Sequence, residues 1–274
     1  MTTVLDNAVG TTPAPATTVG FGNVLRSEWT KLRSVRSTYW TALAAALSTL
    51  AIGIIVCAQW VHEIDRHREQ KDTLDAALTS LNGLYLAQVA VGALGVLVIS
   101  SEYGTGMIRA TLAAVPQRRT LLAAKLVVFS ACTFILGEII SFVTFGICQA
   151  ILHRGASGVS ITDGAALRAV FGGGLYVTAI GLLGFGLGAL IRHTAGALSA
   201  LFGLLFATTA LADLLPTSWR NTVIEYMPLN AGSQIITTQP SHDSLSPWQG
   251  IGVLFLYGIV ALAGALALIS RRDA

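Results

Sequence analysis

Long apolar runs alternate with short polar segments from residue 39 to the C-terminal end of the chain. A transmembrane helix needs about 20 mainly apolar residues, because it rises about 1.5 Å per residue through a hydrocarbon core roughly 30 Å thick. Six runs qualify by length and composition: 39–60, 84–100, 126–152, 169–191, 195–215 and 251–270. The pattern predicts an all-α polytopic membrane protein with six transmembrane helices.

The composition agrees with this prediction. Hydrophobic residues make up 53% of the 274 residues and charged residues only 11%, whereas a soluble domain carries about a quarter charged residues. The chain also has 28 glycines, which transmembrane helices use for close packing. The Gly-Phe-Gly-Leu-Gly stretch at 184–188 is inside the fourth predicted span, so we interpret it as a helix-packing surface.

The distribution of basic residues predicts the orientation of the spans. Of the 17 Lys and Arg residues, 11 fall on the side of both termini and six on the opposite side. Cytoplasmic loops carry the excess of Lys and Arg, so both termini are expected in the cytoplasm. Residues 1–22 have neither a basic region nor an apolar core, and we expect a disordered cytoplasmic tail there.

Two cytoplasmic segments have the pattern of short amphipathic helices. Apolar residues with helical spacing precede the first span, with basic residues among them, which is typical of a helix on an anionic membrane surface: Leu25, Trp29, Leu32, Arg33 and Arg36. The loop after the second span repeats the pattern with Ile108, Leu112 and Val115 before Pro116. For this loop we favour a groove in a partner protein.

The third predicted span contains a polar stripe formed by Glu138, Ser141 and Gln149. An ionisable group in the middle of a span costs about 2.5–3.5 kcal/mol on insertion scales, so Glu138 should not face lipid. Two interpretations stay open. Glu138 either forms a structural hydrogen bond to a neighbouring helix, or it lines a substrate path or a dimer interface.

No motif for nucleotide, metal or catalytic chemistry is present. The three lysines lack the Gly-Lys-Ser/Thr context of a P-loop, and His62 and His67 are spaced i, i+5 instead of the i, i+4 of a zinc-protease helix. The cysteines Cys57, Cys132 and Cys148 lack CxxC spacing, so neither a disulfide framework nor a metal site is indicated. The net charge of +3 does not favour nucleic acid as a partner.

Four sequence segments together resemble one family. They are RSEWTKLRSVRSTYW (26–40), SEYGTGMIRATLAAVPQRRTLLAAK (101–125), GEIISFVTFGICQAIL (137–152) and YMPLNAGSQI (226–235). As a set they are similar to the membrane subunits of type-2 ATP-binding-cassette (ABC) exporters, in the form common in actinobacteria. The resemblance runs from residue 23 to the C-terminal end, so it implies a single permease domain over 23–274.

The resemblance also implies roles for the segments described above. The first amphipathic segment (about 24–37) corresponds to the family's connecting helix, and residues 213–247 to short external helices between spans five and six. The loop after the second span corresponds to the coupling helix that contacts an ATPase, which involves Glu102, Ile108, Arg109, Leu112, Val115, Arg118 and Arg119.

The family's organisation implies the partners. A second permease copy, identical or related, completes the transporter in the bacterial cytoplasmic membrane, and separate nucleotide-binding subunits hold ATP and Mg. This chain is then expected to bind no cofactor itself and to be no enzyme. The implied cargo is hydrophobic or amphipathic, such as a drug, antibiotic, peptide or lipid.

Two rival functions are weighed on the same residues. A proton-coupled secondary transporter using Glu138 predicts inverted repeats and broken helices, yet the two halves lack internal similarity and no proline interrupts a predicted span. An intramembrane enzyme needs several catalytic groups at membrane depth, where Glu138 stands alone.

Overall fold

A computed structural model describes residues 20–66, 75–107, 117–155, 158–212, 214, 216–239 and 244–272. These parts of the chain contain helices and no strand. The helices are α1 (Phe21–Ser34), α2 (Arg36–Arg66), α3 (Ala76–Leu81), α4 (Leu84–Gly104), α6 (Arg118–Leu152), α7 (Gly164–Ile191), α8 (Thr194–Phe202), α9 (Thr208–Ala212), α10 (Thr217–Tyr226), α11 (Pro228–Ser233) and α12 (Pro247–Arg272), with the short turns η2 (His153–Gly155), η3 (Gly203–Ala207) and η4 (Gln234–Ile236).

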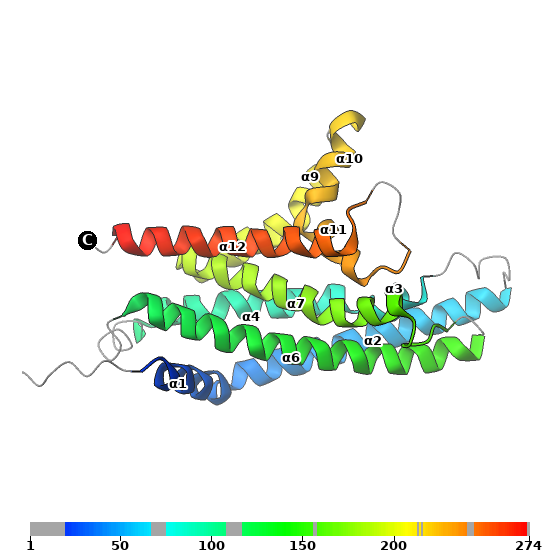
Figure 1. The fold of residues 1–274 in the computed structure, drawn as a ribbon, viewed down its shortest axis with the longest axis horizontal. Coiled ribbons are helices and arrows are strands. Elements are labelled where there is room, and N and C mark those ends of the chain that lie inside the picture. Colours follow the sequence, from blue (N-terminus) through cyan, green and yellow to red (C-terminus); the bar gives the residue numbers. More distant parts are fainter. Residues whose placement is uncertain are drawn as a thin grey trace, which may run out of the picture.

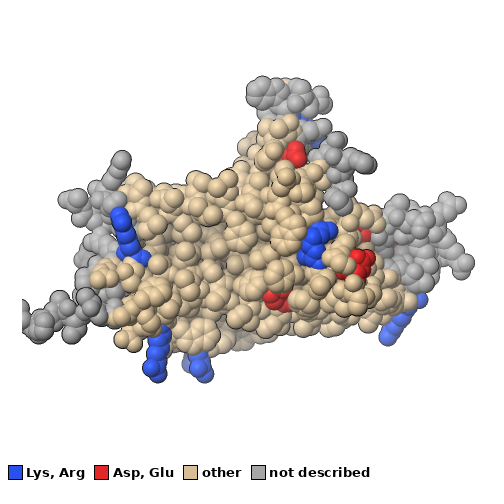
Figure 2. Space-filling model, in the orientation of Figure 1, with Lys and Arg blue, Asp and Glu red and all other residues tan. Residues whose placement is uncertain are grey.

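Five of the described helices are long and apolar enough to cross a membrane, namely α2, α4, α6, α7 and α12. They run side by side along the long axis of the bundle (Figure 1). Most of the visible surface along this axis is uncharged (Figure 2), as expected of side chains that face lipid. The structure thus confirms the predicted all-α polytopic membrane class.

The fifth predicted span, 195–215, differs from the prediction. The structure has a shorter apolar helix over Thr194–Ala207, in which α8 passes into the five-residue π-helical stretch η3, followed by α9. A π-helical stretch interrupts the regular hydrogen-bond ladder. α9 and α10 then project from the bundle (Figure 1). Hydropathy detected the apolar run but not the interruption within it.

Helix α7 is the centre of the bundle. Within its most apolar window, 72% of the residues are buried, against 22–28% for α2, α6 and α12. Its glycines allow backbones to approach closely: a Cβ at Gly184 would lie 2.2 Å from the carbonyl oxygen of Gly92 in α4, and one at Gly186 would lie 2.8 Å from the Cβ of Ala261 in α12. The predicted packing role of the 184–188 stretch is confirmed.

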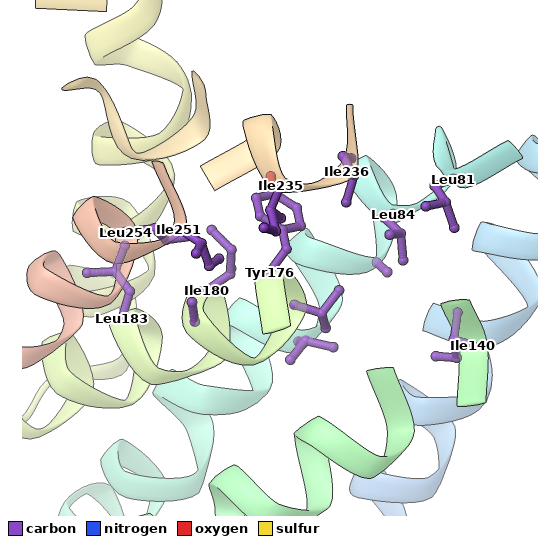
Figure 3. Packing of buried hydrophobic residues seen from close by; sticks show 14 of the residues in the cluster. Leu81, Leu84, Ile140, Tyr176, Ile180, Leu183, Ile235, Ile236, Ile251 and Leu254 are labelled. Atoms are coloured by element: carbon purple, nitrogen blue, oxygen red, sulfur yellow. The ribbon is translucent and has the colours of Figure 1, made fainter. Parts of the chain in front are cut away.

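The main apolar core lies between α7 and its neighbours (Figure 3). Tyr176 and Ile180 of α7 are fully buried there together with Leu254 of α12 and Ile235 of η4. The Tyr176 hydroxyl donates a hydrogen bond to the side-chain oxygen of Gln88 in α4, so this polar pair is satisfied within the core.

Short helices pack against α7 at the end of the bundle opposite α1 (Figure 1). Asp75 connects two of these segments. Its carboxylate caps α3 by accepting from Leu78 N (3.0 Å), and it also accepts from Thr238 N (2.6 Å), Thr238 Oγ1 (2.6 Å) and Gln239 N (3.1 Å). The helices α10 and α11 lie in the 213–247 region, where external helices were predicted.

Candidate functional site

Four charged side chains form a cluster at the C-terminal end of α4, directly before the loop predicted to hold the coupling helix. Glu28 and Lys31 come from α1, Glu102 from α4 and Lys125 from α6. Lys125 Nζ lies 2.5 Å from Glu28 Oε2 and 2.8 Å from Glu102 Oε1. Lys31 Nζ lies 2.7 Å from Glu28 Oε1 and 3.4 Å from Glu102 Oε1. We call these four residues the ionic cluster.

The ionic cluster is buried and neutral overall. Side-chain exposure is 3% for Glu28, 9% for Glu102 and 7% for Lys125, while Lys31 is 33% exposed. Burial lowers the pKa of Lys31, but the hydrogen bond to Glu28 and the charge of Glu102 raise it by more, so its pKa lies above the usual value. Charges taken out of water must be paired, so these contacts fix the relative positions of three helices more than they add net stability.

Packing on α1 explains why Glu28 faces inward. Val24 and Glu28 are four residues apart, so they share one face of the helix. Val24 packs against Leu121 and Ala124 of α6, and this contact directs Glu28 toward Lys125 one turn further along.

The predicted residues of the connecting helix are exposed or half-buried, unlike Val24 and Glu28. Trp29 is 51% exposed, Leu25 and Leu32 are half-buried, and Arg33 and Arg36 are exposed. Glu28 was not among the residues predicted from the sequence. An acid within an otherwise basic helix does, however, indicate a side chain with a buried basic partner. Contact of the connecting helix with lipid stays a prediction.

The same end of α4 also contacts the turn between α7 and α8. Thr194 Oγ1 donates to Ser100 Oγ (2.9 Å), and the Arg192 guanidinium stacks 5.2 Å above the centroid of the Tyr103 ring. Arg192 itself ends α7 in the left-handed conformation with φ 58°, which makes the tight hairpin predicted at 192–194. The C-terminal end of α4 is therefore joined to α1, to α6 and to this hairpin.

A cavity of about 330 Å³ opens beside the ionic cluster. Glu28, Lys31, Glu102 and Lys125 form part of its wall. It is also lined by Leu32, Val35 and Met107 and by apolar side chains of α4 and α6: Leu94, Leu97, Val98, Val128 and Phe129.

The predicted coupling residues fall into two groups. Glu102 is buried in the ionic cluster, and Arg119 is exposed at the start of α6. The others lie outside the described residues or have side chains outside them: Ile108, Arg109, Leu112, Val115 and Arg118. Their role in contacting an ATPase stays a prediction.

The polar stripe of the third span faces neighbouring helices. Ser141 Oγ donates to the carbonyl oxygen of Val170 in α7 (2.6 Å). Gln149 donates to Ser80 Oγ of α3 (3.1 Å) and accepts from Val159 N (2.8 Å). The carboxyl oxygens of Glu138 are buried without a hydrogen-bond partner among the described residues.

The Glu138 side chain lies against α7. A Cβ at Gly174 would meet its Oε1 at 2.3 Å, so only glycine leaves room for the carboxyl group at this crossing. Ser141 and Gln149 thus connect helices, while both interpretations of Glu138 stay open.

The fold defines a multi-pass membrane protein, and the ionic cluster joins three of its helices, α1, α4 and α6. A family model described as ABC-2 family transporter protein matches residues 24–208, which is more than half of the chain. The chain therefore belongs to the ABC-2 transporter family, whose permeases associate with ATP-binding subunits. No curated protein matches the chain.

Proposed function

We propose that the chain is the permease subunit of an ATP-driven exporter in the bacterial cytoplasmic membrane. Two permease copies form the transport path, and separate subunits bind and hydrolyse ATP with Mg. The chain itself carries neither a cofactor nor catalytic residues. The family match supports the permease role, and the apolar bundle suits a hydrophobic or amphipathic cargo. The excess of Lys and Arg on one side supports cytoplasmic termini.

The observation that supports this function most directly is the position of Glu102. It lies within α4 immediately before the loop expected to contact the ATPase, and it is ion-paired to α6 through Lys125 and to α1 through Lys31. A displacement of the loop thus acts on three helices together. If the residue at the start of the loop were exposed and unpaired, a displacement of the loop would move these helices little.

The packing of α4 on α7 extends this mechanical connection across the bundle. α4 is in backbone contact with α7 at Gly95, where a Cβ would lie 2.2 Å from the carbonyl oxygen of Gly181. Close-packed helices transmit strain because they have few voids. Movement of α4 therefore displaces α7, whose opposite end packs against α3 and η4. ATP-driven closure of the partner subunits would in this way open the path at the far side.

The test changes the predicted coupling helix without touching a span. Leu112→Asp places a charge on its apolar face, which would be buried unpaired in a partner groove. The expected result is normal membrane insertion, loss of co-purification with the ATP-binding subunit and loss of substrate-stimulated ATP hydrolysis. Gln117→Asp, an added acid at an exposed position of the same loop, is the matched control. Full association and hydrolysis in Leu112→Asp would disprove the docking role.

A further inference from the structure

Two cysteines from different spans meet near the ends of α2 and α6 beside α3. Cys57 of α2 and Cys148 of α6 are both 0% exposed and belong to one small apolar cluster with Ala76 and Leu152. Cys57 Sγ also lies 4.0 Å from Ser80 Oγ of α3. The two cysteines are thus neighbours within one buried cluster.

The helices approach unusually closely at this point. Gly53 lies one turn before Cys57, and a Cβ there would lie 3.0 Å from Cys148 Sγ and 2.9 Å from Thr144 Cγ2. The backbone of α2 therefore packs directly on the Cys148 side chain. Only a small movement is then needed to bring the two sulfur atoms to bonding distance. Among the described residues no group of three or more His, Cys, Asp or Glu could hold a metal ion. The chemistry open to two neighbouring thiols in such apolar surroundings is oxidation to a disulfide.

We propose that Cys57 and Cys148 are a redox pair that an oxidant of the disulfide class converts into a covalent cross-link between α2 and α6. One thiol, as thiolate, attacks the oxidant's disulfide and releases one oxidant thiol, which leaves a mixed disulfide. The second cysteine attacks this intermediate and releases the other oxidant thiol. The protein loses two protons and two electrons, and the oxidant disulfide is reduced to two thiols.

The cross-link would complete a rigid unit. The opposite end of α6 is already fastened to α1 by the Glu28–Lys125 ion pair, and α1 leads directly into α2. Cys57 lies about 30 Å along α2 from Arg36, at about 1.5 Å per residue. Oxidation would then hold α2 and α6 together at both ends. The proposed orientation places the cysteine pair toward the outside, but formation of the bond does not depend on the export function.

The experiment uses the positions of the lysines. Lys31, Lys71 and Lys125 are the three lysines of the chain, so cleavage after lysine gives fragments 32–71 with Cys57 and 126–274 with Cys132 and Cys148. Folded full-length protein in membranes is treated with dithiothreitol or with diamide, a small thiol oxidant that takes up the same two electrons and two protons as a disulfide oxidant. Free thiols are then blocked with N-ethylmaleimide, the protein is denatured and digested, and the fragments are separated without reductant.

We expect fragments 32–71 and 126–274 to migrate together after diamide and to separate after dithiothreitol. A link already present in untreated membranes would mean that the pair is oxidised in the cell, which equally supports the proposal. Separate fragments after diamide would overturn it. Cys57→Ala and Cys148→Ala should each abolish the link. Cross-linking in Cys148→Ala would show that another thiol reacts, and this would also overturn the proposal.

Cys132 provides the matched control. It is a half-buried cysteine of the same helix and lies about 24 Å from Cys148 at about 1.5 Å per residue. Cys132→Ala should keep the link in full. The melting temperature of the diamide-treated protein should rise in wild type and in Cys132→Ala but not in Cys148→Ala, because only a bond between α2 and α6 constrains the unfolded chain. Normal association of Cys148→Ala with the ATP-binding subunit would separate this proposal from the permease function.

Discussion

Glu28 and Lys125 are 97 residues apart in the chain, yet their side chains form an ion pair of 2.5 Å that fastens α1 to α6. Neither residue belongs to the apolar pattern that defines the spans. Lys125 also pairs with Glu102, which lies just before the predicted coupling loop. Through Lys125, Glu102 is therefore connected to both α6 and α1.

Removing Lys125, the central cation of the ionic cluster, should destabilise the contact between α1, α4 and α6. Lys125→Met leaves Glu28 and Glu102 buried with only the half-exposed Lys31, and breaking a buried pair in this way costs about 3–5 kcal/mol. The free energy of unfolding in mild detergent measures the loss. Arg119→Met changes an exposed base of the same helix and should stay within about 0.5 kcal/mol of wild type. Equal stability of the two variants would contradict the role of the cluster.

The contact between α4 and α7 should not tolerate a methyl group. A Cβ at Gly184 would lie 2.2 Å from the Gly92 carbonyl oxygen, so Gly184→Ala forces the two backbones apart. Overpacking of this kind costs about 1–3 kcal/mol, and the melting temperature should fall. Gly146→Ala meets nothing within 4 Å and should be neutral or stabilising. A fall in both variants would point to helix insertion instead of packing.

Replacing Glu138 should leave the stability of the isolated chain unchanged or raise it. Its carboxyl oxygens have no hydrogen-bond partner within the described part of the chain, so Glu138→Leu removes a buried polar group that gains nothing. Ser141→Ala removes the hydrogen bond to Val170 and should cost about 0.6 kcal/mol or more. Melting in detergent compares the two. A larger loss in Glu138→Leu would reveal a partner for the carboxyl group.

Asp75 should hold α3 and residues 238–239 together. Asp75→Asn turns one acceptor oxygen into a donor that faces donors of Thr238 or Gln239, so the bonds to that oxygen are lost. We expect faster hydrogen exchange at 237–239. Asp163→Asn is the comparison, because Asp163 caps the start of its own helix, α7, by accepting one hydrogen bond from Ala165 N. Unchanged exchange at 237–239 in Asp75→Asn would be evidence against the connection.

The predicted orientation can be tested at two exposed positions. In a background without Cys57, Cys132 and Cys148, Gln117→Cys precedes α6 and Ser160→Cys follows it, and both positions are exposed. A membrane-impermeant maleimide added to intact cells should label position 160 but not position 117. The reverse result would invert the topology, and labelling of both would exclude α6 as a span.

Hydropathy predicted the helical class and six spans, of which five are long helices in the structure, because an apolar run of sufficient length has no other stable form in lipid. The 184–188 glycines were recognisable for a similar reason, since small residues inside a span indicate helix contact. The ionic cluster was not predictable in this way. Glu102 was selected from the family resemblance alone. Its partner Lys125 is the last residue of the same family segment, 101–125, and had no predicted role.

Two further features were not predictable from the sequence: a contact between distant residues and an interruption within an apolar helix. Asp75 and Thr238 are 163 residues apart, and no local pattern relates them. The π-helical stretch η3 was missed because its residues Gly203–Ala207 are as apolar as the helix they interrupt. Sequence periodicity reports which side of a helix is apolar, but it does not report which distant side chain will meet it.

The central place of α7 has a consequence for how the protein is made. α4 and α6 pack mainly against α7 and barely against each other, yet both are synthesised before it. Until α7 is inserted, these two spans are joined chiefly through their smaller contacts with α2, and the glycine surface of α4 is still uncovered. A chain that ends before residue 164 would therefore lack most of the packing of α4 and α6, whereas a chain in which α7 has entered the membrane would have the centre of the bundle assembled.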